Sequence, residues 1–182
     1  MVIGTTELLR LVKERKLVEG LSRRELENPE GTGFDLRVGS MYSLHDGDAY
    51  LGEAERYTAG VEELARYEPG KKRVFELQPG QFILVKTIEK INLPEDIVAI
   101  FRPRSTLCRS GISLHTATAN PGYCGCLTFG MNNTSKNPLK IELGARFVHI
   151  LFFHIDGGIH SAYRGQWQGG RVSTGGVKEE QV

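Results

Sequence analysis

The feature that most constrains the fold is a succession of short apolar runs, each of which ends at a turn. The runs are rich in Val, Ile, Phe and Thr and have the length of strands rather than helices. They occupy residues 34–44, 72–77, 81–93, 96–101, 126–131, 138–143 and 145–155. The segments between them, such as "QPGQ", "LPED", "NPGYCG" and "ELGA", have the composition of turns. Many short strands with few helices predict a mainly β fold, an antiparallel barrel or a jelly roll.

The N-terminus is the clearest exception to this pattern. Residues 5–17, "TTELLRLVKERKL", have the apolar spacing of a short amphipathic helix, with Thr5 or Thr6 as its N-cap. We therefore expect a helical segment within residues 1–27.

The charged stretch 46–72 is expected to be a loop or insertion, with some helix around residues 61–67, "VEELARY". A length of 182 residues is typical of one domain with a sizeable core, so residues 1–182 are predicted to form a single unit.

The overall charge and composition exclude several classes of protein. The formal net charge is +1, so the chain lacks the field that drives general nucleic-acid or acidic-membrane binding. No apolar run approaches the roughly 20 residues of a membrane span, and "MVIGTTELLRLVKERK" is too charged for a signal peptide. We expect a cytoplasmic protein with no nucleic-acid or membrane partner, in which any anion site is local.

The three cysteines, Cys108, Cys124 and Cys126, form neither a disulfide framework nor a zinc pattern. The spacing in "CGC" is too tight for the usual zinc site. Zinc-dependent nucleobase deaminases carry H-x-E followed by P-C-x-x-C, whereas His115 is followed by Thr-Ala and the later segment reads "PGYCGC". We interpret the cysteines as buried or half-buried thiols.

Arginines and hydroxyls gather in "RPRSTLCRSG", directly after the apolar run "IVAIF". Arg104, Ser105, Thr106 and Arg109 lie where a strand gives way to a short helix. A helix N-terminus offers free N–H groups, hydroxyls add donors, and guanidinium groups add forked cationic donors. The cluster suits either a polyphosphate or a solvated helix start. It is not a Walker-type loop, because the glycines and lysine of that pattern are missing.

The C-terminal stretch 158–182 includes "SAYRGQWQGGRVSTGGVKEEQV", which has five glycines and no apolar periodicity. Its side-chain donors are Arg164, Gln166, Gln168, Arg171 and Ser173. Composition alone is compatible with a frayed terminus. The alternative is a mobile flap that closes over an anion, because glycine permits movement and close backbone approach.

Four blocks of the sequence occur in the order found in dCTP deaminases. They are "GTGFDLRVGSMYSL", "PGQFILVKTIEKINLPEDIVAIFRPRSTLCRSGISLH", "NPGYCGCLTFGMNNTSKNPLKIELGARFVHILFF" and "YRGQWQGGRVS". Over roughly residues 28–175 the chain therefore resembles the dCTP deaminase family, which shares a superfamily with the trimeric dUTPases. The resemblance leaves mainly region 46–72 and the last residues unmatched.

The resemblance implies a dUTPase-like distorted β-barrel or jelly roll, assembled as a homotrimer with active sites between subunits. It also implies a deoxynucleoside triphosphate ligand that carries Mg²⁺ on its phosphates, without a metal ligand from the protein. The family's phosphate-binding signature "RSSLxR" corresponds to Arg104, Ser105, Thr106 and Arg109. By this resemblance the cluster is a phosphate site rather than a solvated helix start. Ser105 and Arg109 are also catalytic candidates by this resemblance.

The block that begins "NPGYCG" resembles the hairpin that holds the deoxyribose and the base. By this resemblance Tyr123 is the aromatic residue under the sugar that excludes a 2′-hydroxyl. Backbone groups near Gly125 and Leu127 would read the base edge, and Asn120 and Gly122 complete the nucleoside site.

The last block resembles the family's flap over the triphosphate. It implies that Tyr163, Gln168 and Arg171 bind the nucleotide. Gln168, or Gln166 if the gap is placed differently, corresponds to a phosphate donor of the family. The family's lysine shortly before that glutamine has no counterpart, because Ala162 lies there, and Arg164 or Arg171 would substitute for it.

Two departures from the family pattern concern catalysis. The deaminases carry a general-base glutamate in the pattern "LEFxN", and the corresponding residue here is Gly130. The dUTPases carry an aspartate in "IDxxYxG", and the corresponding residue is Asn120, whose amide can hydrogen-bond but cannot act as a base. Loss of a positioned acid–base group typically costs about 10²–10⁴-fold in rate.

Another residue would have to act as the base. His115 is the candidate, since an unperturbed imidazole titrates near neutral pH, although a histidine among strands is commonly structural. Glu142 in "KIELG" and the thiols of Cys124 and Cys126 are weaker alternatives.

Three hypotheses follow. The first is hydrolytic deamination of dCTP with a relocated base. The second is a catalytically deficient dNTP-binding or regulatory relative. The third is an enzyme for a modified or bulkier nucleotide, in which Gly130 makes room for a substituent. Conversion of dUTP by diphosphate loss is a further alternative.

Overall fold

The predicted apolar runs form one bent antiparallel sheet, so the mainly β prediction is confirmed. A computed structural model describes residues 1–181 of the chain. Its largest sheet has eight strands, with neighbours in the order β8–β12–β2–β7–β10–β9, and with β1 beside β7 and β5 beside β2. These strands are β1 (Val18–Glu19), β2 (Phe34–Leu44), β5 (Val61–Arg66), β7 (Phe82–Asn92), β8 (Ile97–Pro103), β9 (Ile112–His115), β10 (Cys124–Asn133) and β12 (Arg146–His154).

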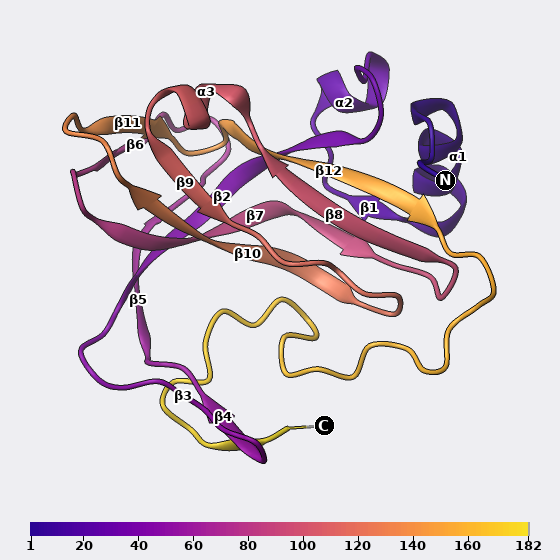
Figure 1. Cartoon of the computed structure of the whole chain (residues 1–182). Helices are drawn as coiled ribbons and strands as arrows, with labels where there is room; N and C mark the ends of the chain where they lie inside the picture. The colour runs from indigo at the N-terminus through magenta and orange to yellow at the C-terminus, as the bar shows by residue number, and fades with distance from the viewer. Residues whose placement is uncertain (182) are drawn as a thin grey trace.

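The sheet curls until its two ends meet. Ala99 in β8 forms an antiparallel bridge with Ala119, which lies just after β9. The N–H of each residue donates to the carbonyl of the other, at 3.0 and 2.9 Å. Since β8 and β9 are the two ends of the strand order, this bridge makes the sheet barrel-like (Figure 1). The expectation of a distorted barrel is confirmed.

Irregularities in β2 allow this curvature. Its register shifts against β5, β7 and β12, and such bulges bend a strand and increase its twist. A Cβ atom at Gly39 would lie 2.8 Å from backbone atoms of Thr87 and Ile88. Only glycine therefore lets β2 approach β7 this closely.

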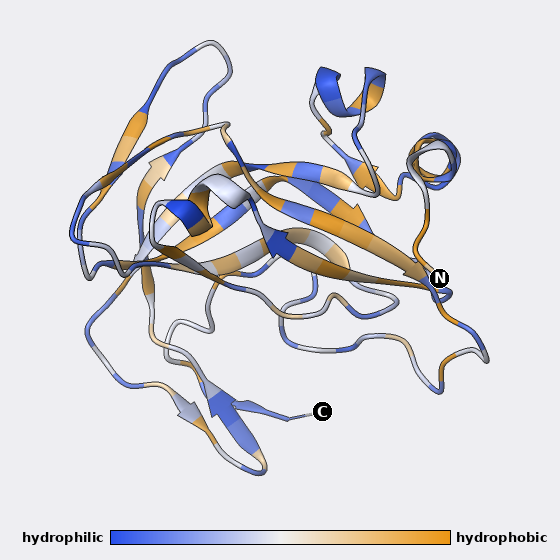
Figure 2. Cartoon of the chain, turned by 45° about the horizontal axis from the view of Figure 1, so that its top comes forward, coloured by the Kyte–Doolittle hydropathy of each residue, from blue (hydrophilic) through white to orange (hydrophobic). Residues whose placement is uncertain are grey.

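One apolar core fills the barrel. Its fully buried side chains include Phe34, Leu36, Ile83, Ile91, Ile97, Met131, Phe147 and Phe152. In β7 every second residue from Ile83 to Ile91 is buried, as the period of a strand requires. Figure 2 shows hydrophobic residues concentrated along the strands of this sheet. Buried Glu89 accepts hydrogen bonds from the backbone and side chain of Arg37, at 2.8 and 2.6 Å, and burial raises its pKa.

Two smaller sheets flank the barrel. One pairs β6 (Val74–Leu77) with β11 (Leu139–Glu142). The other joins β3 (Tyr50–Leu51), β4 (Glu55–Tyr57) and β13 (Glu179–Glu180). We call residues 45–60, which carry β3 and β4, the arm, and residues 158–181 the tail. Figure 1 shows the tail running beneath β10 to the arm.

The expectation of helix around residues 61–67 is wrong, because this segment is strand β5. Glu, Leu, Ala and Arg are good helix formers, but the segment pairs along an edge of β2 and buries Ala65 there. Tertiary pairing therefore overrides local propensity.

The N-terminal segment is helical as predicted. Helix α1 spans Thr5–Arg15 and buries Leu8 and Leu11. Its N-cap is Gly4, without a side-chain cap, so the assignment of Thr5 or Thr6 as the N-cap is wrong. Helix α2 (Arg23–Glu27) is capped by Ser22, and helix α3 spans Ser105–Arg109. No helix within residues 1–181 combines the length and apolar character needed to cross a membrane.

Candidate functional site

The connection between β9 and β10, residues 116–123, is held firmly to the barrel. The N–H of Gly122 donates to the carbonyl of Leu93 at 3.0 Å, and the N–H of Leu93 donates to the carbonyl of Tyr123 at 2.9 Å. A tight turn forms where the N–H of Tyr123 donates to the carbonyl of Asn120 at 3.1 Å. We call residues 116–133 the hairpin.

Tyr123 has its ring buried beneath the tail. Its hydroxyl donates to the carbonyl of Cys126 at 2.7 Å, and its ring meets that of Tyr163 edge to face at 5.5 Å. Burial raises the pKa of Tyr123 above that of an ordinary phenol. The side chain is therefore a neutral, fixed aromatic surface.

The tail docks onto the hairpin through backbone groups. The N–H of Tyr163 donates to the carbonyl of Pro121, and the N–H of Gly169 donates to the carbonyl of Cys124, both at 2.7 Å. The side chain of Gln168 accepts from the N–H of Cys124 and donates to the carbonyl of Gly122, both at 2.9 Å. Gln168 therefore lies on the hairpin.

A pair of glycines allows this docking. A Cβ atom at Gly125 would lie 2.3 Å from the backbone nitrogen of Gly170, and one at Gly170 would lie 2.7 Å from the backbone nitrogen of Cys126. The two backbones therefore approach each other more closely than any residue with a side chain permits.

The tail is also fastened to the arm. The N–H of Thr58 donates to the hydroxyl of Thr174 at 2.9 Å, and the N–H of Thr174 donates to the hydroxyl of Thr58 at 3.0 Å. Strand β13 then pairs with β4. The description of this segment as a frayed terminus does not fit these contacts.

A cavity of about 440 Å³ lies between the hairpin, the arm and the tail. Five of the predicted nucleotide-binding residues line it, namely Asn120, Tyr123, Leu127, Tyr163 and Arg171. Further aromatic walls come from Phe82, Phe101, Phe129 and Trp167. Its size is that of a small-molecule site, for which roughly 300–1,000 Å³ is usual. None of the described residues that line it carries a carboxylate or an imidazole.

The arginine–hydroxyl cluster begins α3 at the opposite end of the barrel from the β9–β10 connection (Figure 1). Ser105, Thr106 and Arg109 are exposed there. Ala99 bridges Ala119 of the hairpin, and Ser105 lies six residues farther along extended chain. At roughly 3.3 Å per residue this separation is about 20 Å. Phe101 lines the cavity and lies four residues before Ser105, but none of the four residues of the phosphate cluster lines it, so in one chain the cluster is not part of the cavity wall.

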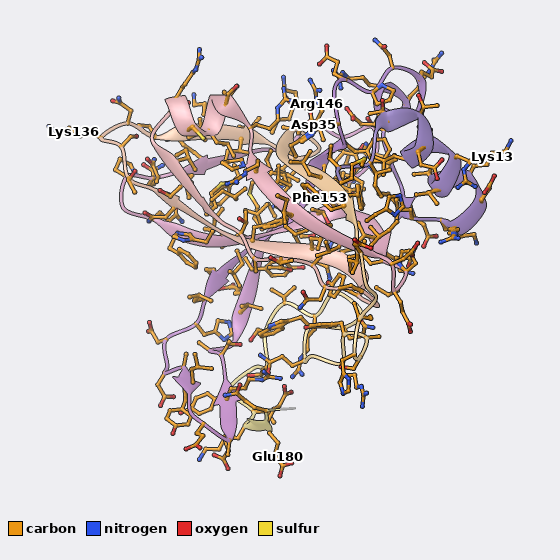
Figure 3. The ribbon with its side chains drawn as sticks, turned by 45° about the vertical axis from the view of Figure 1, so that its right-hand side comes forward. Lys13, Asp35, Lys136, Arg146, Phe153 and Glu180 are labelled. Carbon is orange, nitrogen blue, oxygen red and sulfur yellow. The ribbon has the colours of Figure 1, made fainter. Side chains whose placement is uncertain are left out.

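Arg104 belongs to a buried charge cluster. Its guanidinium donates to Oδ2 of Asp35, and Arg146 donates to the same oxygen at 2.9 Å. The other carboxylate oxygen lies 2.9 Å from Nδ1 of His149. Buried Glu25 accepts from the N–H of Asp35 at 3.1 Å. Figure 3 shows Asp35 and Arg146 close together. Burial and then the charge of Arg146 lower the pKa of Arg104.

Gly130 faces an aromatic side chain. It lies opposite His115 of β9, and a Cβ atom at Gly130 would be 2.9 Å from Cζ of Phe82 and 3.3 Å from Cβ of His115. The rings of Phe82 and His115 are 5.9 Å apart, and His115 is exposed. Room for a substrate substituent at Gly130 stays a prediction, and it requires the Phe82 ring to turn aside, because this ring occupies the space beside Gly130.

The weaker base candidates lie elsewhere. Glu142 is exposed in β11, with Oε2 3.3 Å from Nζ of Lys72, and does not line the cavity. Cys124 and Cys126 are half-buried as expected, and burial raises the pKa of Cys126. Cys108 is exposed, so its interpretation as a buried thiol is wrong.

Sequence reasoning missed part of this site. Trp167, the single tryptophan of the chain, lines the cavity, and its place in a polar, glycine-rich tail was a usable signal. Phe82 begins β7 as an outward residue, which alternation predicts. Asp35 lies between Phe34 and Leu36 in an apolar strand, and an acid in that position signals a buried partner.

Comparison with known proteins identifies the family to which the chain belongs. A family model described as dCTP deaminase-like matches residues 2–155. A "dCTP deaminase, dUMP-forming" of Dictyoglomus turgidum is 31% identical, over 90% of this chain and 85% of the relative. A dCTP deaminase of Pyrococcus furiosus is 32% identical, over 87% and 88%, and one of Pyrobaculum calidifontis is 30% identical, over 96% and 95%.

Solved structures support the fold. A 2′-deoxycytidine 5′-triphosphate deaminase from Agrobacterium tumefaciens superposes with a TM-score of 0.63 at 17% identity, over 83% of this chain and 46% of that one. This chain thus spans just under half the length of that structure. A mutant dUTPase from phage phi11 of S. aureus gives a TM-score of 0.50 at 14% identity, over 81% and 95%. The barrel is dUTPase-like, and the chain belongs to the dCTP deaminase-like family.

Proposed function

We propose that this protein binds a pyrimidine deoxynucleoside triphosphate and deaminates its cytosine hydrolytically. The observation that carries the proposal is that Asn120, Tyr123, Leu127, Tyr163 and Arg171 line one cavity together. An apolar cavity with a few convergent polar groups suits a nucleoside. The relatives named dCTP deaminase support the reaction type.

The proposed site needs more than one copy of the chain. The phosphate cluster on α3 does not line the cavity, and it lies about 20 Å along the strand from the Ala99–Ala119 bridge, by the roughly 3.3 Å rise of each residue. In a homotrimer, the α3 cluster of one subunit would meet the cavity of a neighbour. Within each subunit, the tail would act as the flap, with Gln168 fastening it to the hairpin; residue 182 of the predicted flap 158–182 lies outside the described residues.

Magnesium fits this arrangement as a companion of the triphosphate. Among the described residues, no group of three or more His, Cys, Asp or Glu side chains is placed to hold a metal ion. The donors on α3 are guanidinium, hydroxyl and backbone N–H groups, which bind phosphate oxygens rather than cations. Bound through the phosphates, Mg²⁺ would neutralise part of their charge.

The reaction replaces the amino group at C4 of cytosine by oxygen from water and releases ammonia. His115 is the proposed base, because it lies directly opposite Gly130, where the deaminases carry glutamate. It does not line the cavity itself, so this role requires the Phe82 side chain to move. Ser105 and Arg109 would act from the neighbouring subunit.

A second candidate function is nucleotide binding without turnover. It is favoured by Gly130 and by the lack of any carboxylate or imidazole among the described residues that line the cavity. The binding residues and the aromatic walls are compatible with either function.

Incubation with Mg²⁺ and a panel of natural and modified dNTPs, read by mass spectrometry, separates these functions. Deamination raises the nucleotide mass by about one unit, and His115→Gln should abolish that product, whereas exposed His154→Gln should not. Loss of diphosphate from dUTP without deamination of dCTP would instead place the reaction with the dUTPases. Tight binding of dCTP without a product would establish the second candidate.

A further inference from the structure

A second cavity lies against the tail. Its volume is about 670 Å³, and it is lined by Arg56 of β4 and by residues 160–167 of the tail. It shares Tyr163 and Trp167 with the first cavity, so these two rings stand between the two spaces. The tail therefore forms part of the wall of both cavities.

The lining of the second cavity is basic. Arg56, Arg164 and His160 line it, and no aspartate or glutamate does so among the residues that the structure describes. Glu179 lies opposite Arg56 in the pairing of β13 with β4, but its carboxylate forms an ion pair with Arg171 instead. The positive charge of this cavity is therefore not neutralised from within its own walls.

Arg56 is held in position. Its Nε donates to Oε1 of Gln166 at 2.7 Å, which leaves the two terminal amino groups of the guanidinium available. It lies on β4, which pairs with β3 on one side and β13 on the other. A guanidinium that is fixed and has free terminal groups suits a phosphate, which accepts two parallel hydrogen bonds. Arg104, by contrast, already donates to Asp35.

We propose that the second cavity is an anion site that binds a phosphate group through Arg56 and Arg164, with Ser161 as a hydroxyl donor. The arm and the tail of one chain build this site without α3, so it is distinct from the phosphate cluster on which the proposed function relies. The phosphate belongs either to the nucleotide in the first cavity or to a separate phosphate compound.

The test is isothermal titration calorimetry with inorganic tripolyphosphate on the full chain and on the variant Arg56→Gln/Arg164→Gln. Glutamine keeps an N–H for Gln166, so the tail stays docked. We expect the Kd for tripolyphosphate to rise by about tenfold or more, because charge-assisted hydrogen bonds are lost. The variant Arg23→Gln/Arg66→Gln removes the same charge from exposed positions and should leave the Kd nearly unchanged.

Titration with dCTP then identifies the source of the phosphate. A matching loss of dCTP affinity in the Arg56/Arg164 variant assigns the site to the nucleotide, and an unchanged dCTP affinity assigns it to a separate phosphate compound. Failure of the unmodified protein to bind tripolyphosphate, or an equal Kd in the double variant, overturns the proposal. Deoxycytidine carries no phosphate, so its titration, followed by the fluorescence of Trp167, tests binding in the first cavity alone. Failure of deoxycytidine to bind would therefore contradict the proposed function without contradicting the anion site.

Discussion

The arginines at the two ends of the barrel differ in whether a carboxylate neutralises their charge. At the α3 end, Arg104 and Arg146 share the buried carboxylate of Asp35, so much of their charge is neutralised inside the subunit. At the hairpin end, the first cavity is walled by aromatic rings, and Arg56 and Arg164 line a neighbouring space without a carboxylate among its described residues.

This difference shows that a sequence motif can identify an arginine but does not reveal whether its guanidinium is already paired with a carboxylate. Arg104 belongs to the sequence signature and yet supports the structure through Asp35. Arg56 belongs to no signature and yet has free terminal amino groups. Variants at each end can separate structural charge from binding charge.

The largest effect is expected for Asp35→Asn. Removal of this buried charge leaves Arg104 and Arg146 without their shared carboxylate, and loss of one partner from a buried ion pair costs about 3–5 kcal/mol. The free energy of unfolding in urea measures this loss. Asp156→Asn, at an exposed position, should change it little. A loss below about 1 kcal/mol for Asp35→Asn would show that solvent already screens the cluster.

The next effect is expected at the glycines of the tail. Gly169 and Gly170 both have φ near +80°, but a Cβ atom meets nothing within 4 Å at Gly169 and backbone of Cys126 at Gly170. Gly169→Ala should cost about 1–2 kcal/mol for its left-handed backbone, and Gly170→Ala about 1–3 kcal/mol more for overpacking. Equal unfolding free energies for the two variants would contradict the docking of the tail.

The fluorescence of Trp167 measures, in the same two variants, whether the tail stays docked on the hairpin. Gly170→Ala should shift its emission to longer wavelength and increase quenching by acrylamide, since Trp167 would leave the aromatic walls of the cavity. Gly169→Ala should leave both signals closer to those of the unmodified protein.

The contrast between the two ends also shows how far the sequence could predict the molecule. Alternation in β7 and the turn chemistry of "NPGYCG" identify the barrel strands and the hairpin, because these signals are local. The strand character of β5 follows from pairing with β2, and the place of Gln168 follows from hydrogen bonds to Gly122 and Cys124. Both depend on partners distant in sequence, so periodicity and propensity do not reveal them.

The site could be predicted only in part for the same reason. Resemblance named Tyr123 and Tyr163, which the structure brings together at 5.5 Å between ring centres. The ring of Phe82 beside Gly130 depends on the register of β7 against β10, in which Gly130 lies opposite Leu84. The sequence of neither strand alone determines this register.

A smaller stability effect is expected for Gly130→Glu. The obstructing atoms belong to the end of the Phe82 ring, which is 38% exposed and can turn aside. The free energy of unfolding should therefore fall by about 1 kcal/mol or less. Gly39→Ala, where the obstructing atoms are backbone, should cost clearly more. If the missing carboxylate limits catalysis, Gly130→Glu should also increase deamination of dCTP.

The smallest effect concerns two of the three thiols, Cys108 on α3 and Cys126 on β10. Cys108 on α3 is exposed, whereas Cys126 is half-buried beneath Gly170, and burial raises its pKa. Because only the thiolate reacts, Cys126 should be alkylated by iodoacetamide more slowly than Cys108 near neutral pH. Its rate should keep rising at a pH where an ordinary thiol is already ionised. Peptide mass spectrometry measures both rates. In Gly170→Ala the rate at Cys126 should increase while that at Cys108 stays constant, and a parallel increase at both would mean that the whole barrel has loosened.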